Sequence, residues 1–270
     1  MSLRTGIFVD ALSVSFNGGF GLRFDNLRKY ALRNGYQPGR FNVYLAIDQE
    51  RAADDLGYRG KTNRFCEVLR DFEYKVVEKQ VTVPKHAETG EPLVRPNVSV
   101  EMALDMVDQC RDLDHVLLLT NDPDFVKVIR KIQTYGCRVE LIGFNNIPPA
   151  LKKEADFFVS GFMIPGLLPV QGNNTEWGKI GSRVRGVCYD FSHDDGYGFL
   201  RFLNRYDLPL WITDSRAENS PYKTVFAHIS QFEPNFDTSY VPSRDLIFEF
   251  TLTENDKGLI AEDIILFSAP

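Results

Sequence analysis

The chain of 270 residues has few cysteines, histidines and tryptophans, with four, four and two of each. The four cysteines are far apart and lie in apolar segments, at Cys66, Cys110, Cys137 and Cys188. This spacing excludes a CxxC zinc knuckle and does not suggest a disulfide framework. We expect the cysteines to be buried and reduced, because a free cysteine packs as a small hydrophobic side chain.

Long apolar runs are also missing. No stretch reaches the ~18 consecutive apolar residues from which a membrane-spanning helix is inferred. The N-terminus lacks a basic segment followed by an apolar run and a small-residue cleavage site, which a secretory leader requires. We therefore expect a cytoplasmic protein with no membrane partner.

Positive charge is not in excess. The formal net charge is −6, which disfavours indiscriminate binding to phosphates. From Gly172 onward the chain has 9 Lys+Arg against 15 Asp+Glu, whereas the preceding part has 22 of each. The acidity therefore lies in the C-terminal third, and the length suits two domains of about 100 to 200 residues.

Up to about residue 163, short apolar runs alternate with segments of helical period. The runs that predict strands are 5–10, 42–47, 74–83, 115–120, 138–143 and 156–161, and the segments that predict helices are 24–35, 58–72, 97–113 and 123–136. Runs such as VLLL are typical of strands covered on both faces. The pattern predicts an α/β domain over residues 1–163, with a mainly parallel sheet sandwiched by helices.

A change of composition follows this domain. Two prolines and four glycines interrupt the stretch 163–182, and we expect residues 164–182 to form a linker. Short β-branched and aromatic runs then occur at 183–191, 196–202, 224–230, 245–252 and 258–267. They predict a small all-β domain over residues 183–270, in the form of an antiparallel barrel.

Acidic residues occur at the ends of two predicted strands. Asp10 ends the first strand, and Asp122 follows the fourth in the sequence TNDPDF. Ligands collect at the carboxyl ends of strands in an open α/β sheet. Two converging carboxylates are costly unless a cation or a shared proton relieves them, and a hard ion such as Mg²⁺ needs only one or two carboxylates. Asp105, at the edge of an acidic stripe on the helix 97–113, is a third candidate.

The same residues also have a purely structural interpretation. Asp122 is an N-cap residue type, Pro123 suits a first helical position, and Asp124 suits the positive end of a helix dipole. The stripe of Glu101, Asp105, Asp108 and Asp112 is equally what a solvated helix face requires. These residues alone do not decide between binding and structure.

Five segments, in this order, carry a resemblance to a known family: FVD (8–10), RPNVSVEMALD (95–105), TNDPDF (120–125), RVELIGF (138–144) and LKKEADFFV (151–159). Over roughly residues 4 to 163 the chain resembles the NYN family, in the LabA-like branch of the PIN-like nucleases. The resemblance implies a ribonuclease whose acidic residues hold Mg²⁺ or Mn²⁺. By position it implies catalytic roles for Asp10, Asp105, Asp122 and Asp124, metal binding by the first three, and nucleic-acid binding by Arg95.

Two positions depart from the family pattern. Ser99 stands where the family usually has an aspartate at the start of the helix, and Ser13 stands where the first motif usually continues to an asparagine. Ser99 removes a formal charge from the expected metal site, and metal affinity falls with fewer anionic ligands. Three outcomes therefore stay open: catalysis is weakened, it depends on Glu101, or it is lost. Asn17 is a candidate to replace the missing amide, with a plain turn role as the alternative.

The C-terminal domain carries a second resemblance. The segments GVCYDFSHDDGYGFLRF (186–202) and VFAHIS (225–230) are similar to the two aromatic motifs of the cold-shock domain, an OB-type barrel. The resemblance implies nucleic-acid binding by Phe191, Tyr197, Phe199, Phe226 and His228. Alternate residues of adjacent strands share a face, so such rings can stack unpaired bases, with a role in the barrel core or a protein interface as the alternative.

This domain also departs from its pattern. Asp190 replaces the usual tryptophan, Asp195 replaces a lysine, and an extra stretch around 203–222 separates the two motifs. Each aspartate weakens the attraction to phosphate.

Two functions stay open. The first is a metal-dependent ribonuclease whose barrel recruits single-stranded RNA, and the second is an impaired PIN-like scaffold that binds RNA or protein without cleavage. A phosphotransfer enzyme of the haloacid-dehalogenase type is disfavoured, because FVDALSV lacks a second aspartate two residues after the first. RNA is the expected partner, and a homodimer stays open.

Overall fold

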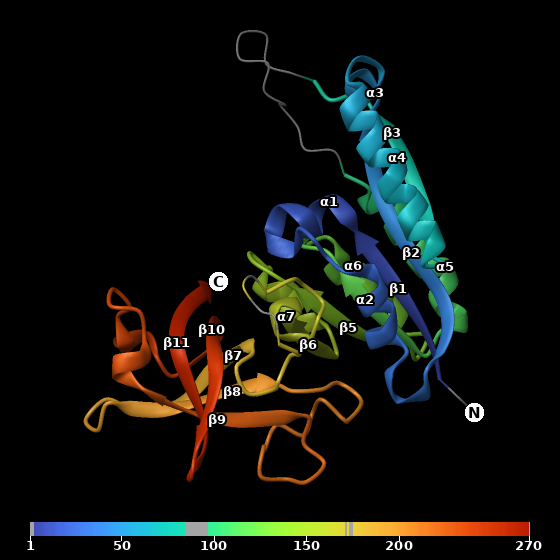
Figure 1. The fold of residues 1–270 in the computed structure, drawn as a ribbon. Coiled ribbons are helices and arrows are strands. Elements are labelled where there is room, and N and C mark those ends of the chain that lie inside the picture. Colours follow the sequence, from blue (N-terminus) through green and yellow to red (C-terminus); the bar gives the residue numbers. More distant parts are fainter. Residues whose placement is uncertain (1–2, 85–96, 171, 173–174, 270) are drawn as a thin grey trace. The chain divides into compact units, whose positions relative to one another are not determined.

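The computed structural model describes residues 3–84, 97–170, 172 and 175–269 (Figure 1). The chain forms two compact units. The first is built from residues up to Phe20 and from Phe24 to Val159, and the second from Gly21–Arg23 and from Ser160 onward. Residues 164–182, expected as a linker, fall in the second unit, and Ile164 and Leu167 among them are buried. No helix of the described residues is long and apolar enough to span a membrane.

A six-stranded sheet in the order β3-β2-β1-β4-β5-β6 forms the first unit. Its strands are β1 (Arg4–Asp10), β2 (Gln37–Asp48), β3 (Lys75–Val81), β4 (His115–Leu119), β5 (Arg138–Gly143) and β6 (Phe157–Ser160). The pairs β1 with β2, β1 with β4, β2 with β3 and β4 with β5 are parallel. The predicted fold class, a mainly parallel sheet with helices, is therefore confirmed.

Helices cover both faces of this sheet. They are α1 (Ala11–Val14), α2 (Phe24–Ala31), α3 (Gln49–Asp54), α4 (Leu56–Asp71), α5 (Ser99–Gln109), α6 (Phe125–Gln133) and α7 (Pro149–Glu154). The helices α5, α6 and α7 bury Met102, Ile129 and Leu151 in one cluster with Phe8 of β1 and Leu118 of β4. On the other face, α2 reaches Glu140 of β5 through Tyr30, as described below, and α2 contacts α4 through the rings of Phe24 and Phe65. Strands buried on both faces explain the uniformly apolar runs.

Three short helices of four to six residues, α1, α3 and α7, were not predicted from the sequence. A helix of this length is too short for periodicity to reveal it. Their starts do carry local signals: the Asp48 carboxylate accepts the N–H of Arg51 at the start of α3, and α7 has a proline at its first position.

The second unit is a closed five-stranded barrel in the order β10-β11-β9-β8-β7. Its strands are β7 (Arg183–Ser192), β8 (Tyr197–Leu203), β9 (Tyr222–His228), β10 (Ser243–Asn255) and β11 (Gly258–Ser268). The barrel closes through the antiparallel pair of β10 with β7. The pairs of β7 with β8, β8 with β9 and β10 with β11 are also antiparallel, as predicted. The pair of β9 with β11 is parallel, at Phe226 and Ile260, and the prediction of an antiparallel barrel was wrong for this one pair. The closed barrel is consistent with an OB-like domain.

A glycine allows the first two barrel strands to approach each other closely. Gly198 of β8 is buried, and a Cβ atom there would lie 2.3 Å from the carbonyl oxygen of Asp190 on β7. Any other residue would push the strands apart. Gly198 thus has a packing role, and the aromatic residues on either side of it, Tyr197 and Phe199, point to the opposite face because side chains alternate along a strand.

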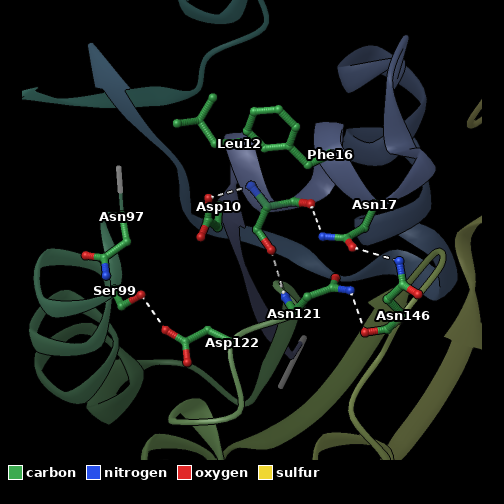
Figure 2. Close-up of a pocket in the computed structure, with 10 residues that line it drawn as sticks. Asp10, Leu12, Phe16, Asn17, Asn97, Ser99, Asn121, Asp122 and Asn146 are labelled. Carbon is green, nitrogen blue, oxygen red and sulfur yellow. Dashed lines mark hydrogen bonds between the residues drawn. The ribbon is translucent and has the colours of Figure 1, made fainter. Parts of the chain in front are cut away.

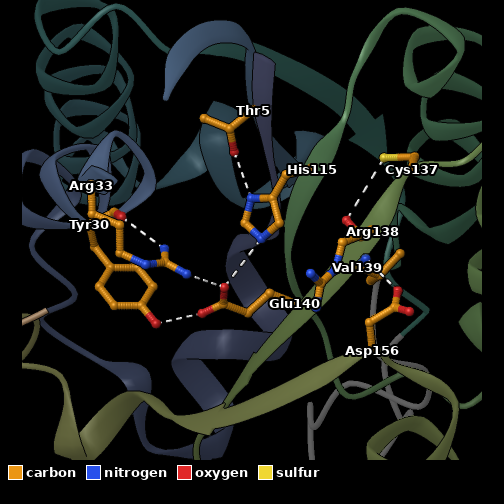
Figure 3. A network of polar contacts seen from close by, with 9 residues as sticks. All are labelled: Thr5, Tyr30, Arg33, His115, Cys137, Arg138, Val139, Glu140 and Asp156. Atoms are coloured by element: carbon orange, nitrogen blue, oxygen red, sulfur yellow. Dashed lines mark hydrogen bonds and ion pairs between the residues drawn. The ribbon is translucent and has the colours of Figure 1, made fainter. Parts of the chain in front are cut away.

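A buried polar network joins α2 to the amino ends of the central strands (Figure 3). The Glu140 carboxylate accepts hydrogen bonds from the Tyr30 hydroxyl and the Arg33 guanidinium, and lies 3.2 Å from Nε2 of His115. Nδ1 of His115 lies 3.0 Å from Oγ1 of Thr5. An ionised carboxylate only accepts, so Nε2 carries the hydrogen, and in the neutral ring Nδ1 accepts from Thr5.

Burial alone would raise the pKa of the Glu140 carboxyl. The hydrogen bond from His115 and the charge of Arg33 outweigh burial, so the pKa of Glu140 lies below its ordinary value. The side chain of Arg33 is also buried, with 7% exposed, and Glu140 is its partner. Removing one member of such a pair leaves an uncompensated buried charge.

We predict that Glu140→Gln lowers the free energy of unfolding by about 3 to 5 kcal/mol, because Arg33 loses its buried counter-ion. Urea denaturation at pH 7 measures this loss. Glu154→Gln is the matched control, since it breaks the pair of Glu154 with the largely exposed Arg130 and should have a far smaller effect. Equal effects of the two substitutions would show that the network does not stabilise the fold.

The stability difference between the native chain and Glu140→Gln should also depend on pH. A carboxyl whose folded pKa is depressed stabilises the fold above its unfolded pKa, about 4.3 for glutamate, and loses this contribution as the pH falls through the folded value. The two denaturation curves should therefore converge below about pH 4. A constant difference between pH 3 and pH 7 would contradict this origin of the stability.

Candidate functional site

Asp10 is placed at the carboxyl end of β1, where the strand passes into α1. Its Oδ1 accepts the N–H of Ser13 at 3.0 Å, so the carboxylate caps α1. The side chain is nearly buried, with 6% of the residue exposed. Burial raises the pKa of Asp10, the N–H of Ser13 opposes this, and the negative charge of Asp122 raises it further. Asp10 and Asp122 are therefore close enough to repel each other.

Asp122 follows β4 and leads into α6. Its Oδ1 accepts the N–H of Asp124 at 2.9 Å, and its Oδ2 accepts the hydroxyl of Ser99 at 2.5 Å. The first bond forms the turn before α6, which is the structural interpretation of the DPD sequence. The second bond joins this turn to the start of α5. Asp122 thus has a structural role and a position in the pocket described next.

A cavity of about 400 Å³ lies at the carboxyl edge of the sheet (Figure 2). It is lined by Asp10, Leu12, Ser13, Phe16, Asn17, Asn97, Ser99, Asn121, Asp122 and Asn146. The chain runs from β1 outward to β2 and β3, and β4 returns to the other side of β1. The pocket therefore lies where the strand order reverses, which is the usual ligand position in open α/β sheets.

The wall of the pocket is held by amide and hydroxyl groups. Oγ of Ser13 accepts the N–H of Asn121 at 2.9 Å, and Nδ2 of Asn17 donates to the carbonyl of Ser13 at 2.7 Å. Nδ2 of Asn121 donates to the carbonyls of Asn145 and Asn146. Ser13 and Asn17, singled out from the sequence, both line the pocket. Asn121 and Asn146 were missed, although each lies shortly after a predicted strand.

Other predicted site residues lie outside this lining. Oδ2 of Asp105 accepts the hydroxyl of Tyr44 at 2.8 Å, and burial followed by this hydrogen bond raises the pKa of Tyr44. Asp124 is exposed and contributes its backbone N–H. Glu101 pairs with Lys79 of β3 at 3.0 Å. Arg95 lies outside the described residues.

The polar side chains that line the pocket are carboxylates, hydroxyls and amides. Two of them are carboxylates, and neither histidine nor cysteine is among the lining residues. Across the described parts of the chain, no three His, Cys, Asp or Glu side chains form a group that could hold a metal ion. Two carboxylates with neutral oxygens still fit a hard cation such as Mg²⁺, which keeps waters and takes further oxygens from a phosphate. They fit Zn²⁺ poorly, because the typical zinc sites of proteins contain histidine nitrogen or cysteine sulfur besides any carboxylate.

Three aromatic rings form a cluster on the outer side of the barrel. The ring centroids of Tyr197 and Phe226 lie 5.6 Å apart, those of Phe199 and Phe226 lie 6.1 Å apart, and those of Tyr197 and Phe199 lie 6.5 Å apart. The cross-strand pairs are Phe199 with Phe226 and Tyr197 with His228. Leu200, Val225 and Ala227, which alternate with these residues, are fully buried. The rings therefore lie outside the barrel core.

The remaining residues of the cold-shock resemblance have different surroundings. Phe191 is buried in the barrel core against Phe232, so it is not part of the outer cluster. Asp195 accepts the Ser192 hydroxyl at 2.7 Å in the turn between β7 and β8. Asp190 is exposed and lines a second pocket, between the barrel and the extra stretch of sequence.

Comparison with known proteins identifies one family model, described as NYN domain, which matches residues 4–165. Similar solved structures include a protein of unknown function from Vibrio parahaemolyticus, with 19% identity and a TM-score of 0.47, covering 59% of this chain and 93% of that chain. Another, described as "Structural Basis for the Mechanism and Regulation of Sir2 Enzymes", has 10% identity and a TM-score of 0.25, covering 59% of this chain and 86% of that chain. No curated protein matches the chain.

We predict that Asp10→Asn stabilises the fold at pH 7 in metal-free buffer. The raised pKa of Asp10 means that its ionised form is unfavourable in the folded state, and asparagine keeps an oxygen to accept the N–H of Ser13. The gain should be complete above the raised pKa and should disappear as the pH falls below about 3.9, the unfolded value. Denaturation from pH 3 to pH 8 measures it, with Asp108→Asn on an exposed helix face as the control. A loss of stability at pH 7 would contradict the prediction.

Proposed function

Because the chain belongs to the NYN domain family, part of the PIN-like nuclease superfamily, we propose that it is a metal-dependent ribonuclease that cleaves single-stranded RNA. The observation that carries this proposal is the position of Asp10 and Asp122. Both line one pocket at the reversal of strand order, and the charge of Asp122 raises the pKa of Asp10. A site that draws two carboxylates together without a basic side chain in its lining is suited to a cation.

Asp10 and Asp122 would hold Mg²⁺ or Mn²⁺. When bound, such a cation lowers the pKa of water and offsets negative charge on the phosphoryl oxygens. The N–H of Ser13 orients Asp10, while the Ser99 hydroxyl and the N–H of Asp124 orient Asp122. These bonds fix both carboxylates before a ligand arrives, which lowers the ordering cost of binding.

Substrate RNA would contribute the remaining oxygen ligands through its phosphate. Phe16 also lines the pocket, and its ring is exposed, with 62% of the residue accessible. An exposed ring beside a phosphate site suits an unpaired base, because every base has a face that stacks. This combination supports single-stranded RNA over a paired duplex, whose bases are already stacked.

The barrel supports RNA binding through stacking more than through charge. The cluster of Tyr197, Phe199 and Phe226 lies outside the core, with the exposed His228 opposite Tyr197. The C-terminal third of the chain is acidic, so the general attraction to phosphate is weak. We therefore propose that the barrel binds unpaired bases on this cluster.

A second candidate function is an RNA-binding or protein-binding scaffold that does not cleave. Ser99 supports it, because its neutral hydroxyl bonds Asp122 at the position where an acidic side chain would add a third carboxylate. Two carboxylates bind a divalent cation less tightly than three. The two candidates differ in cleavage, not in RNA binding.

We predict that the purified protein cleaves labelled single-stranded RNA in the presence of Mn²⁺ or Mg²⁺, and that Asp122→Asn lowers the rate by at least about a hundredfold, since the charge stabilisation lost is several kcal/mol. Asp108→Asn, an exposed position on α5 outside the pocket, is the matched control and should cleave at the native rate. Cleavage that survives Asp122→Asn would place the reaction elsewhere.

The variant Ser99→Asp separates the two candidate functions in the same assay. An aspartate at this position lies beside Asp122, so it adds a third carboxylate to the pocket. If the native chain does not cleave and Ser99→Asp does, the scaffold is the correct function and Ser99 is its cause. If neither cleaves with either metal ion, the nuclease proposal is refuted.

We predict that Phe226→Ala weakens the binding of a uridine-rich oligonucleotide by about fivefold to a hundredfold, because one stacked base contributes about 1 to 3 kcal/mol. The ring of Phe226 lies against both other rings of the cluster. Tyr240→Ala is the control, since Tyr240 is exposed, with 67% accessible, and lies outside the cluster. Fluorescence anisotropy at fixed salt measures both. Equal affinities would indicate that the cluster serves a different ligand.

A further inference from the structure

The extra stretch between β8 and β9 folds onto the barrel in a defined way. Arg201 of β8 donates through Nη1 to the carbonyl of Thr213 at 3.0 Å. Ser215 and Thr224 share a hydroxyl hydrogen bond of 2.5 Å, and the Tyr189 hydroxyl lies 3.0 Å from the same Thr224 oxygen. Residues 213 to 215 are therefore tied to β8 and β9 and form a wall over them, while the bond of Tyr189 joins β7 to the same residue of β9.

A cavity of about 570 Å³ lies between this wall and the strands. It is lined by Tyr189, Asp190, Phe199, Arg201, Thr213, Asp214, Ser215, Arg216 and Thr224. A pocket of about 300 to 1,000 Å³ accommodates a small organic group. Phe199 belongs both to this lining and to the outer aromatic cluster, so the pocket is continuous with the surface proposed to stack bases.

Two of the four charged residues in the lining neutralise each other. Arg216 donates through Nε and Nη2 to the two oxygens of Asp214, at 2.9 and 2.8 Å. These hydrogen bonds lower the pKa of Asp214 to about 2, so the pair stays ionised at neutral pH. Its charges satisfy each other and leave Arg201 and Asp190 to interact with a ligand.

Arg201 is a half-buried cation without a carboxylate partner in the described parts of the chain. Its Nε is buried and has no hydrogen-bond partner there, and its guanidinium lies over the rings of Tyr189 and Tyr222, at 5.4 and 5.2 Å. Burial lowers the pKa of Arg201, but an arginine keeps its proton in a protein. Of its two terminal nitrogens, Nη1 donates to Thr213, and Nη2 has no acceptor within the described residues, so Nη2 is the donor left for a ligand.

Asp190 provides the negatively charged group of this pocket. It is exposed on β7 beside Phe199 of β8, its partner in the strand register. No ion pair involves its carboxylate within the described residues. An ionised carboxylate accepts hydrogen bonds with two oxygens and donates none. The pocket thus combines a carboxylate, a guanidinium and an aromatic face.

We propose that this pocket binds one guanine base of single-stranded RNA. Guanine has two adjacent donors, N1–H and the N2 amino group, which match the two oxygens of Asp190. On the neighbouring edge it has the acceptors O6 and N7, which an arginine recognises with two donors. The ring of Phe199 supplies a stacking face. The other three bases lack the pair of adjacent donors, so guanine is the base that satisfies both charged groups.

This inference rests on the proposed RNA binding by the barrel, and adds a base preference to it. It explains two features that the cold-shock resemblance left as departures. The negative charge of Asp190 disfavours the binding of phosphate, but its oxygens can accept hydrogen bonds from the edge of a base. The extra stretch forms a wall, so that the outer face of the strands becomes one side of a pocket. Recognition by hydrogen bonds also suits an acidic domain whose attraction to phosphate is weak.

The test compares uridine hexamers that carry a single guanosine, inosine, adenosine or cytidine at one internal position. Binding to the full chain is measured by fluorescence anisotropy in EDTA, so that cleavage does not interfere. We expect the guanosine hexamer to bind about tenfold more tightly than the all-uridine hexamer, as for a good two-donor contact. Inosine lacks the N2 amino group and should lose most of this gain.

Asp190→Asn tests the carboxylate, and its exposed position makes loss of the fold unexpected. It should remove the difference between guanosine and inosine. Asp256→Asn, at an exposed turn between β10 and β11, changes the charge equally and should keep the difference. Equal affinity of the native chain for the guanosine and all-uridine hexamers, or an unchanged preference in Asp190→Asn, overturns the proposal.

The outcome is distinguishable from failure of the nuclease proposal. Guanosine preference in a protein that does not cleave with Mn²⁺ supports this pocket and refutes only the catalytic function. Cleavage together with equal hexamer affinities supports the nuclease and overturns the guanine pocket. If none of the hexamers binds, the guanine pocket is overturned together with RNA binding by the barrel.

Discussion

The parallel pairing of β1 with β4 is the constraint on which the first unit depends. The register aligns Thr5 with His115 at one end of the two strands and Val9 with Leu119 at the other. The first end joins the buried network around Glu140, and the second end leads directly to Asp10 and Asp122. One strand pair thus connects a stabilising polar network to a site that carries unfavourable charge at the opposite edge.

This separation has a physical reason. At the amino ends of the strands, each buried charge has a partner: Arg33 faces Glu140, and His115 connects that carboxylate to Thr5. At the carboxyl ends, Asp10 and Asp122 have hydrogen-bond donors but no cationic side chain in the pocket lining. A stable scaffold tolerates such a strained site, and relief of the repulsion between the two carboxylates would favour the cation proposed to bind there.

The barrel shows how a single aromatic motif divides between packing and surface. Phe191 lies in the core, whereas Phe199, whose neighbour Gly198 pairs with Phe191 across the strands, lies on the outer side. Gly198 permits this arrangement, because it leaves room for the β7 backbone. The segment between β8 and β9 then covers part of the same outer side and creates a pocket with two opposite charges, which have no ion-pair partner among the residues that the structure describes. In the RNA binding proposed for this domain, stacking and hydrogen bonding would offset the weak general attraction of an acidic domain to phosphate.

Runs of apolar, β-branched and aromatic residues were sufficient to predict the six strands of the sheet and the five strands of the barrel, and helical periodicity was sufficient to predict the four helices that are long enough to show it. The pattern also located Asp10 and Asp122 at the ends of strands, and the motif order indicated the family. Helices of four to six residues and the parallel pair of β9 with β11 were not visible, since the first are shorter than the periodic signal and the second is a long-range contact.

Side-chain partners were decided by tertiary structure alone. Asp105 was grouped with Asp10 and Asp122 from its sequence position, yet its carboxylate accepts a hydrogen bond from the Tyr44 hydroxyl, because α5 packs against β2. Ser99, seen in the sequence as a missing charge, is a donor to Asp122. Asn121 and Asn146 both line the pocket because the pairing of β4 with β5 brings the ends of these two strands together. The sequence by itself determined which helices and strands form and which strands are followed by an acidic residue. Only the packing of these elements decided which carboxylates lie close together.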